Sequence, residues 1–344
     1  MDSKTQKNIS KSIKEIAKEA DVSIATVSNV INKSYKVREK TRKKVEDVIR
    51  KYNYRVNIGA SSLRSKISKL IGLIVPEISN PLFANFYEKL EPFARELGYS
   101  IVICNNNYDY KKDIENIEIL ALHNIDGLIM FPSIEDPKVM MPALQYDIPV
   151  VLIHRKIENL ECDVVTIDNY KAAYDVVNYL VSMGHKKILF TSAEPGYYLG
   201  QMKLKGFIDG MEANGLVLTK ESIIKVDNFE FDGGLDLVDK ILKFREKPTA
   251  IVAYTDRLAI GIMKALEVKG FKVPEDFSVI GFDNIPLDNY LHVGLTSVGY
   301  GIVEHAKRAL QLLIERIKYR NSPHKIILIP ATIIKRESVG SPHK

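Results

Sequence analysis

One stretch, residues 13–32 (IKEIAKEADVSIATVSNVIN), constrains the fold more than any other part of the chain. Its first half carries apolar residues at three- and four-residue steps: Ile13, Ile16, Ala17 and Ala20. This spacing places them on one face of a helix. Ser12, followed three residues later by Glu15, is a capping box that opens this helix.

A second short helix is expected after a break at residues 21–23, with Ser23 as its N-cap. Its inward face consists of Val27, Val30 and Ile31. Its outward face consists of small or uncharged side chains: Ile24, Ala25, Thr26, Ser28 and Asn29. Such groups suit base edges and phosphates in a major groove, although the pattern alone also fits an ordinary surface helical hairpin.

Charge is unevenly distributed along the chain. Residues 1–66 hold 17 Lys or Arg against 7 Asp or Glu, a balance of +10, whereas the remaining residues hold 32 against 36, a balance of −4. The positive excess coincides with the helix-turn-helix pattern, where it attracts phosphate from a distance. Double-stranded DNA is therefore the expected partner.

From residue 69 the pattern changes to apolar strands that alternate with amphipathic helices, which is typical of parallel α/β sheets. Strands are expected at 70–76, 99–105, 126–132, 148–154, 162–167, 186–192, 223–226, 249–254, 277–282, 295–301 and 325–330. Helices are expected between them, and two such units in series predict two lobes with a cleft between them.

Composition and motifs exclude several other classes. No apolar run reaches the ~18 residues that span a bilayer, and the polar N-terminus lacks a signal-peptide core, so we expect a cytoplasmic protein without a membrane partner. Cys104 and Cys162 have no metal or redox spacing and are expected to be small buried hydrophobes. GxSxG, HExxH, GxxxxGK[ST] and GxGxxG are all absent, so we expect no enzyme, no metal and no cofactor.

At the helix-turn-helix stretch (IKEIA, then VS-x-x-TVS, then V-x-N) the chain resembles the LacI family of bacterial transcription regulators. Further family signatures lie at 78–81 (ISNP), 184–188 (GHKKI), 273–276 (VPED), 279–283 (VIGFD) and 335–338 (KRES). The resemblance implies an all-α helix-turn-helix headpiece joined to an α/β core of two parallel-sheet lobes, of the type I periplasmic-binding-protein kind.

The resemblance also implies a division of the chain. The expected parts are a headpiece at 1–56, a hinge helix or linker at 57–66 and an effector-binding and dimerisation core at 67–344. Within the core, the N-lobe is expected at about 67–166 and 295–324, and the C-lobe at about 167–294 and 325–344. The chain then crosses between the lobes three times.

By resemblance the protein is a homodimeric regulator, most often a repressor, that reads a near-palindromic operator. Base-edge contacts are expected from Ile24, Ala25 and Asn29, and phosphate contacts from Thr26, Ser28 and Asn32. Further DNA contacts are expected from Ser12, Ser23, Tyr54, Asn57 and Ala60. Leu63 would insert into the minor groove from a hinge that is a flexible linker off DNA. Arg38 stands where the family usually caps a third helix, expected at 41–52, with Ser.

The cleft is expected to hold a small-molecule effector. The residues that the resemblance places there are Phe83, His154, Arg155, Lys203, Phe229, Asp256 and Asp283. Phe83 and Phe229 would stack on the ligand, and Asp283 would accept its protons; alternatively, Asp256 only caps a helix and Asp283 only holds a turn. A neutral or anionic sugar, phosphorylated or not, is the first expectation, and a purine-like base is the second.

One other form of control and two other classes of protein are alternatives to this interpretation. Some relatives respond to a phosphorylated carrier protein that docks outside the core. A transporter's solute-binding protein shares the core fold, but it would have a signal peptide and no basic headpiece. A sugar-metabolising enzyme would need a catalytic set of residues, which the sequence lacks.

Overall fold

The computed structural model describes residues 11–31, 37–54, 67–193 and 198–342. The chain forms two compact units, Met1–Ser68 and Lys69–Lys344. The division lies two residues from the boundary expected between hinge and core. The expected hinge contacts, and Asn32, lie outside the described residues.

The described part of the headpiece contains three helices: α1 (Ile13–Glu19), α2 (Ile24–Ile31) and α3 (Glu39–Lys51). The capping box that opens α1 is present, because the Ser12 amide donates to Glu15 Oε2 at 2.7 Å and the Glu15 amide donates to Ser12 Oγ at 3.4 Å. The Thr26 amide donates to Ser23 Oγ at 3.1 Å, as expected for the cap of α2. Arg38 provides no such bond at the start of α3.

The headpiece core is small and entirely apolar. Its buried members are Ile16, Ala17, Ala20, Val27, Val30 and Val45. They come from all three helices, and the inward faces expected for α1 and α2 are confirmed. Packing rather than intrinsic propensity therefore holds these short helices together.

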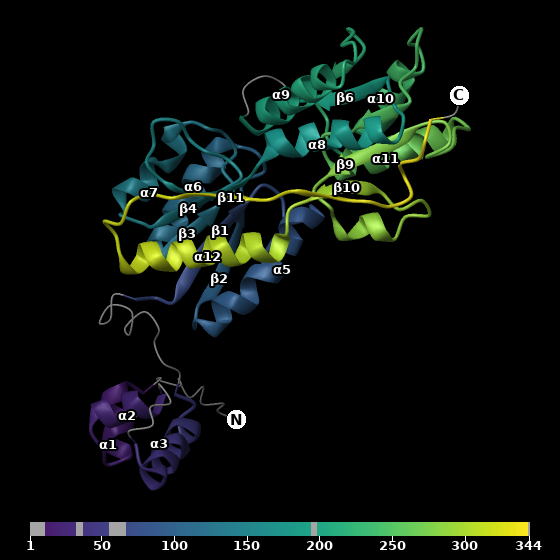
Figure 1. The fold of residues 1–344 in the computed structure, drawn as a ribbon. Coiled ribbons are helices and arrows are strands. Elements are labelled where there is room, and N and C mark those ends of the chain that lie inside the picture. Colours follow the sequence, from purple (N-terminus) through teal and green to yellow (C-terminus); the bar gives the residue numbers. More distant parts are fainter. Residues whose placement is uncertain (1–10, 32–36, 55–66, 194–197, 343–344) are drawn as a thin grey trace, which may run out of the picture. The chain divides into compact units, whose positions relative to one another are not determined.

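The N-lobe is a six-stranded, all-parallel sheet in the order β11-β5-β4-β3-β1-β2 (Figure 1). Its strands are β1 (Leu70–Val75), β2 (Ser100–Asn105), β3 (Gly127–Met130), β4 (Val150–Ile153), β5 (Asp163–Ile167) and β11 (Ile326–Ile329). The helices α5 (Pro81–Glu96) and α12 (Ile302–Lys318) cover one face. The other face carries α6 (Tyr110–Leu122), the 3-10 turn η1 (Pro137–Met140) and α7 (Met141–Gln145).

The C-lobe is a second six-stranded sheet in the order β12-β10-β9-β8-β6-β7. Its strands are β6 (Ile188–Ser192), β7 (Ile223–Lys225), β8 (Ala250–Val252), β9 (Ser278–Phe282), β10 (Thr296–Gly299) and β12 (Thr332–Ile334). Its helices are α8 (Asn169–Ser182), α9 (Tyr198–Ala213), α10 (Gly233–Ile241), α11 (Asp256–Val268) and the 3-10 turn η2 (Pro286–Asn289). Only the edge strand β12 of these described strands runs antiparallel to its neighbour.

The strand order confirms three crossings between the lobes but corrects where two of them occur. The strand at 296–299 was expected in the N-lobe and pairs instead with β9 of the C-lobe. The strand at 326–329 was expected in the C-lobe and pairs instead with β5 of the N-lobe. The chain therefore crosses after β10 and after β11, one strand later than expected each time.

Contacts that are distant in sequence explain both corrections. Arg316, near the end of α12, forms a buried, two-pronged ion pair with Asp163 at the start of β5, with Nε–Oδ2 at 2.7 Å and Nη2–Oδ1 at 3.1 Å. The Lys325 amide also donates to Asp163, which carries β11 into the same sheet. In the C-lobe, Ser297 Oγ on β10 donates to the buried Asp256 carboxylate at 2.6 Å.

Candidate DNA-binding surface and effector cavity

The outward face of α2 exposes part of the set expected to contact DNA. Ala25 and Asn29 are exposed, whereas Ile24 is partly buried against the headpiece core. Thr26 Oγ1 lies 2.9 Å from Ser23 Oγ, so these two hydroxyls form a hydrogen bond at the start of the helix. Ala25 and Asn29 are thus the two side chains that this face presents most openly.

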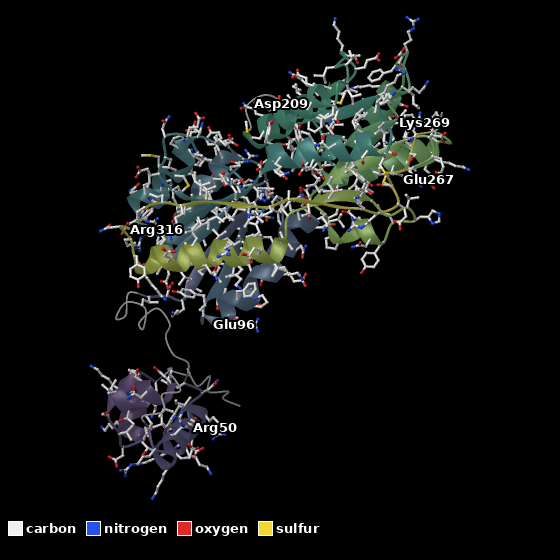
Figure 2. All side chains as sticks on the ribbon, viewed as in Figure 1. Arg50, Glu96, Asp209, Glu267, Lys269 and Arg316 are labelled. Carbon is white, nitrogen blue, oxygen red and sulfur yellow. The ribbon has the colours of Figure 1, made fainter. Side chains whose placement is uncertain are left out.

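The expected backbone contacts lie in more varied surroundings. Ser12 is exposed and occupied by its capping box, Ser28 is partly buried, and Tyr54 packs against the headpiece core. The described part of the headpiece also exposes eight basic side chains: Lys14, Lys18, Arg38, Lys40, Lys43, Lys44, Arg50 and Lys51. Figure 2 marks Arg50 on this unit. A surface of this charge attracts the DNA backbone irrespective of base sequence.

Within the core unit, a cavity of about 150 Å³ lies between the two lobes, at the carboxyl ends of the parallel strands. Ligands of open α/β sheets bind at such strand ends. We call it the effector cavity. Its polar and aromatic lining residues are Asn80, Phe83, Tyr108, Phe131, His154, Arg155, Asn169, Lys203, Tyr254, Thr255, Phe282, Asp283 and Tyr300.

Lys203 of α9 brings a buried ammonium group to this cavity. Its Nζ donates to the Tyr254 carbonyl at 3.1 Å and lies 4.4 Å and 4.2 Å from the ring centroids of Tyr254 and Phe282. Burial lowers the pKa of Lys203 to about 8, against a partial opposing effect of Asp283. The group is therefore a cation near neutral pH that aromatic faces stabilise.

Asp283 provides the carboxylate expected at the end of β9. The hydroxyl of Tyr300 donates to its Oδ1 at 3.1 Å, and burial raises its pKa to about 6. Its backbone has a φ of 117°, and Asn284 follows at 49°. Non-glycine residues with such angles are held by their surroundings, so the surrounding structure fixes the turn that carries this side chain.

The N-lobe side of the cavity is aromatic and largely neutral. The His154 ring lies 5.2 Å from the Phe131 ring and 5.0 Å from that of buried His305, and burial holds the pKa of His154 well below its ordinary value. Phe83 packs edge-on against Phe131 at 5.0 Å. Arg155 Nη1 donates to the Ser133 carbonyl at 2.9 Å and adds a guanidinium at the lining.

Five of the seven residues expected in the cavity line it, and two do not. Phe229 instead packs its ring against Tyr254 at 4.6 Å, behind the lining. Asp256 is completely buried, and its carboxylate accepts from Ser297 Oγ and from the Ile285 amide at 3.0 Å. Its role is structural, but it is not the helix cap of the alternative interpretation, because Thr255 caps α11.

Several lining residues were not anticipated as contacts. Tyr254 and Tyr300 each follow the last residues of a strand, and Asn169 begins α8 directly after β5. Their positions at strand ends were the available signal. Tyr108 lies farther along the loop after β2, where only the fold brings it to the cavity.

The geometry defines a class: a basic helix-turn-helix unit on the same chain as a two-lobed α/β core with a ligand-sized cavity. Residues 12–57 match the sequence profile "Bacterial regulatory proteins, lacI family", and residues 177–339 match "Periplasmic binding protein-like domain". The HTH-type transcriptional repressor PurR of Mannheimia succiniciproducens is 32% identical over 95% of this chain and 98% of that protein. The chain therefore belongs to the lacI family of bacterial regulatory proteins.

Two solved structures support the fold. The Lac repressor dimer bound to operator and the anti-inducer ONPF matches with a TM-score of 0.83 at 21% identity, over 96% of this chain and 99% of that one. A LacI family regulator from Enterococcus faecium with bound ribose matches with a TM-score of 0.72 at 25% identity, over 79% and 99%. Family membership makes this chain a DNA-binding transcription regulator and confirms that it is not an enzyme.

Every helix in the described part of the chain is too short or too polar to cross a lipid bilayer.

Proposed function

We propose that this protein is a homodimeric repressor of a near-palindromic operator. Its affinity for the operator changes when a monosaccharide-sized effector binds in its cavity. The observation that carries the proposal is the effector cavity, where a buried ammonium and a buried carboxylate of one lobe face aromatic rings of the other. A cavity of this kind suits a ligand with hydroxyl groups and an apolar ring face.

The size and polarity of the cavity favour a single sugar ring. Its volume of about 150 Å³ has room for one small ring in this conformation of the lobes. Asp283 would accept from hydroxyl groups, Lys203 would donate to them, and neutral His154 tolerates an uncharged ligand. The regulator from Enterococcus faecium that holds ribose shares this core fold.

On the DNA side, two copies of α2 would each enter a major groove. Ala25 and Asn29 would reach base edges, and the basic surface would contact phosphates. Because the operator is chromosomal DNA, the proposed place of action is the bacterial cytoplasm. The hinge at 57–66 would transmit lobe movement to the headpieces, with a coupling of about 1–3 kcal/mol.

For the homodimer we propose a two-fold contact through the outer face of α11. A surface groove of about 520 Å³ there is lined by Ile260, Met263, Phe271, Val273, Leu291 and Val293. Lys264 and Lys272 alternate on its rim with Glu267 and Glu275, so the rim carries both signs of charge. A face of this composition is complementary to its own copy across a two-fold axis.

A thermal-shift screen on the full chain tests the effector. The panel is D-ribose, D-glucose, glucose 6-phosphate, cellobiose, hypoxanthine and guanine. At about 5–10 mM, a ligand that is well above its Kd raises the free energy of unfolding by ~2–4 kcal/mol. A single sugar should raise Tm, and Asp283→Asn should abolish the rise. Asp227→Asn, an exposed carboxylate of the same lobe, is the matched control.

Operator binding is tested in parallel by fluorescence anisotropy with a library of double-stranded DNA at low salt. Selection of a palindromic site, and a changed affinity for it when the panel sugar is added, would support the proposal. Failure to bind any duplex would refute the regulatory function, whereas DNA binding that no sugar alters would refute only the effector.

A further inference from the structure

An ion-pair cluster joins the two lobes beside the effector cavity. Arg257, in the first turn of α11 in the C-lobe, pairs through Nη1 with Glu77 Oε2 at 3.2 Å. Glu77 lies in the N-lobe, between β1 and α5. Arg257 also contacts the carboxylate of Glu230, which belongs to its own lobe. One guanidinium thus bridges a carboxylate of each lobe.

The C-lobe side of this cluster is rigidly built. Thr255 caps α11 by accepting from the Leu258 amide at 3.2 Å, and its hydroxyl donates to the Phe229 carbonyl at 2.9 Å. This second bond ties the segment that carries Glu230 to the start of α11. The Arg257 guanidinium also lies 5.4 Å from the centre of the Phe231 ring. Its position is therefore set before it meets the N-lobe.

The N-lobe side is also held in place. Ser79 Oγ donates to Glu77 Oε1, and this bond together with Arg257 holds the pKa of Glu77 below its usual range. The Ile78 amide donates to Asn105 Oδ1 at 3.2 Å, which fixes the loop after β1. The side chain of Arg257 is only 13% exposed, compared with 34% for Glu77, so solvent screens this pair less than a surface pair.

We propose that the Arg257–Glu77 ion pair is a latch that holds the two lobes closed and thereby sets how readily the effector enters and leaves. This inference rests on the proposed function for its regulatory meaning. A partly buried pair of this kind favours the closed arrangement about 2- to 5-fold. Since apparent affinity scales with the fraction of molecules in the binding-competent arrangement, the latch tunes the effector concentration to which the regulator responds.

Distance measurement by double electron–electron resonance on the full chain, without effector or DNA, tests the latch. Spin labels are placed at Lys111→Cys and Asp227→Cys, two exposed positions that follow the edge strands β2 and β7. Burial raises the pKa of Cys162 to about 12 and also raises that of Cys104, so both native thiols label slowly at neutral pH. Wild-type protein exposed to the label reports any residual native labelling.

Glu77→Gln should enlarge the long-distance population about 2- to 5-fold while the shape of the side chain is kept. Arg257→Met should do the same to at least that extent. Glu230→Gln removes a contact within one lobe and should not open the protein. Asp209→Asn, on α9 of the C-lobe (Figure 2), removes an ordinary ion pair with Lys205 and should also leave the distances unchanged.

Unchanged distances in both Glu77→Gln and Arg257→Met would overturn the latch, as would equal opening in Glu230→Gln. Raising KCl to about 1 M should mimic Glu77→Gln in the wild-type protein and add nothing in the variant. The experiment contains neither DNA nor effector, so its failure leaves the proposed function intact. Conversely, the latch can be demonstrated even where the sugar panel fails.

Discussion

The two lobes share one sheet architecture but bury charge in different ways. The N-lobe pairs its buried charges completely: Asp163 receives two bonds from Arg316, and Asp113 accepts from Ser133 and Asn106. The C-lobe instead places Lys203 and Asp283 at the effector cavity. In the described structure, Lys203 donates a hydrogen bond to the Tyr254 carbonyl. Buried charge in the N-lobe thus stabilises the fold, whereas the C-lobe, besides its structural Asp256, holds two buried charges that are available to a ligand.

The largest effect is expected where the N-lobe's buried ion pair is broken. Arg316→Met should lower the free energy of unfolding by about 3–5 kcal/mol, because Asp163 would stay completely buried without its partner. Chemical denaturation monitored by circular dichroism measures this loss. Arg308→Met, on the same helix but in an exposed pair with Glu304, should cost ~0.5 kcal/mol or less. A loss under about 1 kcal/mol for Arg316→Met would contradict the structural role of this pair.

Replacing the buried cation of the C-lobe should affect ligand binding more than stability. Lys203→Met should leave the free energy of unfolding unchanged or slightly higher, because the desolvation cost of the buried ammonium offsets its carbonyl hydrogen bond and its contacts with two rings. Effector affinity, measured by calorimetry with the sugar identified in the panel, should fall by at least about tenfold. Lys205→Met removes an exposed ammonium two residues away that pairs with Asp209, and it should alter neither quantity. A Lys203→Met variant that is destabilised but binds the effector normally would show that Lys203 stabilises the fold and does not bind the ligand.

Local chemistry made the headpiece predictable. The capping box at Ser12, the cap at Ser23 and the inward faces of α1 and α2 all depend on residues within four positions of one another. The apolar runs of the core located its strands to within about two residues at most ends for the same reason. Spacing along the chain carries this information directly.

Pairing across the fold was not predictable in this way. The sheet to which β10 or β11 belongs depends on partners such as Asp163, which lies 153 positions from Arg316. Likewise, the position of Asp256 in its helix was evident, but the burial of its carboxylate against Ser297 required the fold. Resemblance therefore led to a cavity that five of the seven predicted residues line, and it mistook two neighbours, Phe229 and Asp256, for lining residues.

The pH dependence of effector binding should report the titration of both Asp283 and Lys203. Burial raises the pKa of Asp283 to about 6 and lowers that of Lys203 to about 8. Below pH 6 the carboxylate gains a proton and no longer accepts from two sides, and above pH 8 the ammonium loses one. Affinity measured by calorimetry should therefore be highest between these values and fall up to about tenfold per pH unit outside them. Lys203→Met should remove only the loss of affinity at alkaline pH. An affinity that does not change with pH would exclude both Asp283 and Lys203 as effector contacts.

The smallest expected effect concerns Tyr300, whose ring packs in the N-lobe core while its hydroxyl donates to Asp283 of the C-lobe. This bond lowers the pKa of Asp283 against the effect of burial. Tyr300→Phe should therefore move the acid limb of effector binding upward by roughly half a pH unit to one unit, since a bond worth ~1 kcal/mol corresponds to ~0.7 pKa units. Tyr319→Phe, at the exposed end of α12, should leave the limb in place. A limb that does not move in Tyr300→Phe would mean that the N-lobe covers the ligand without adjusting the charge that binds it.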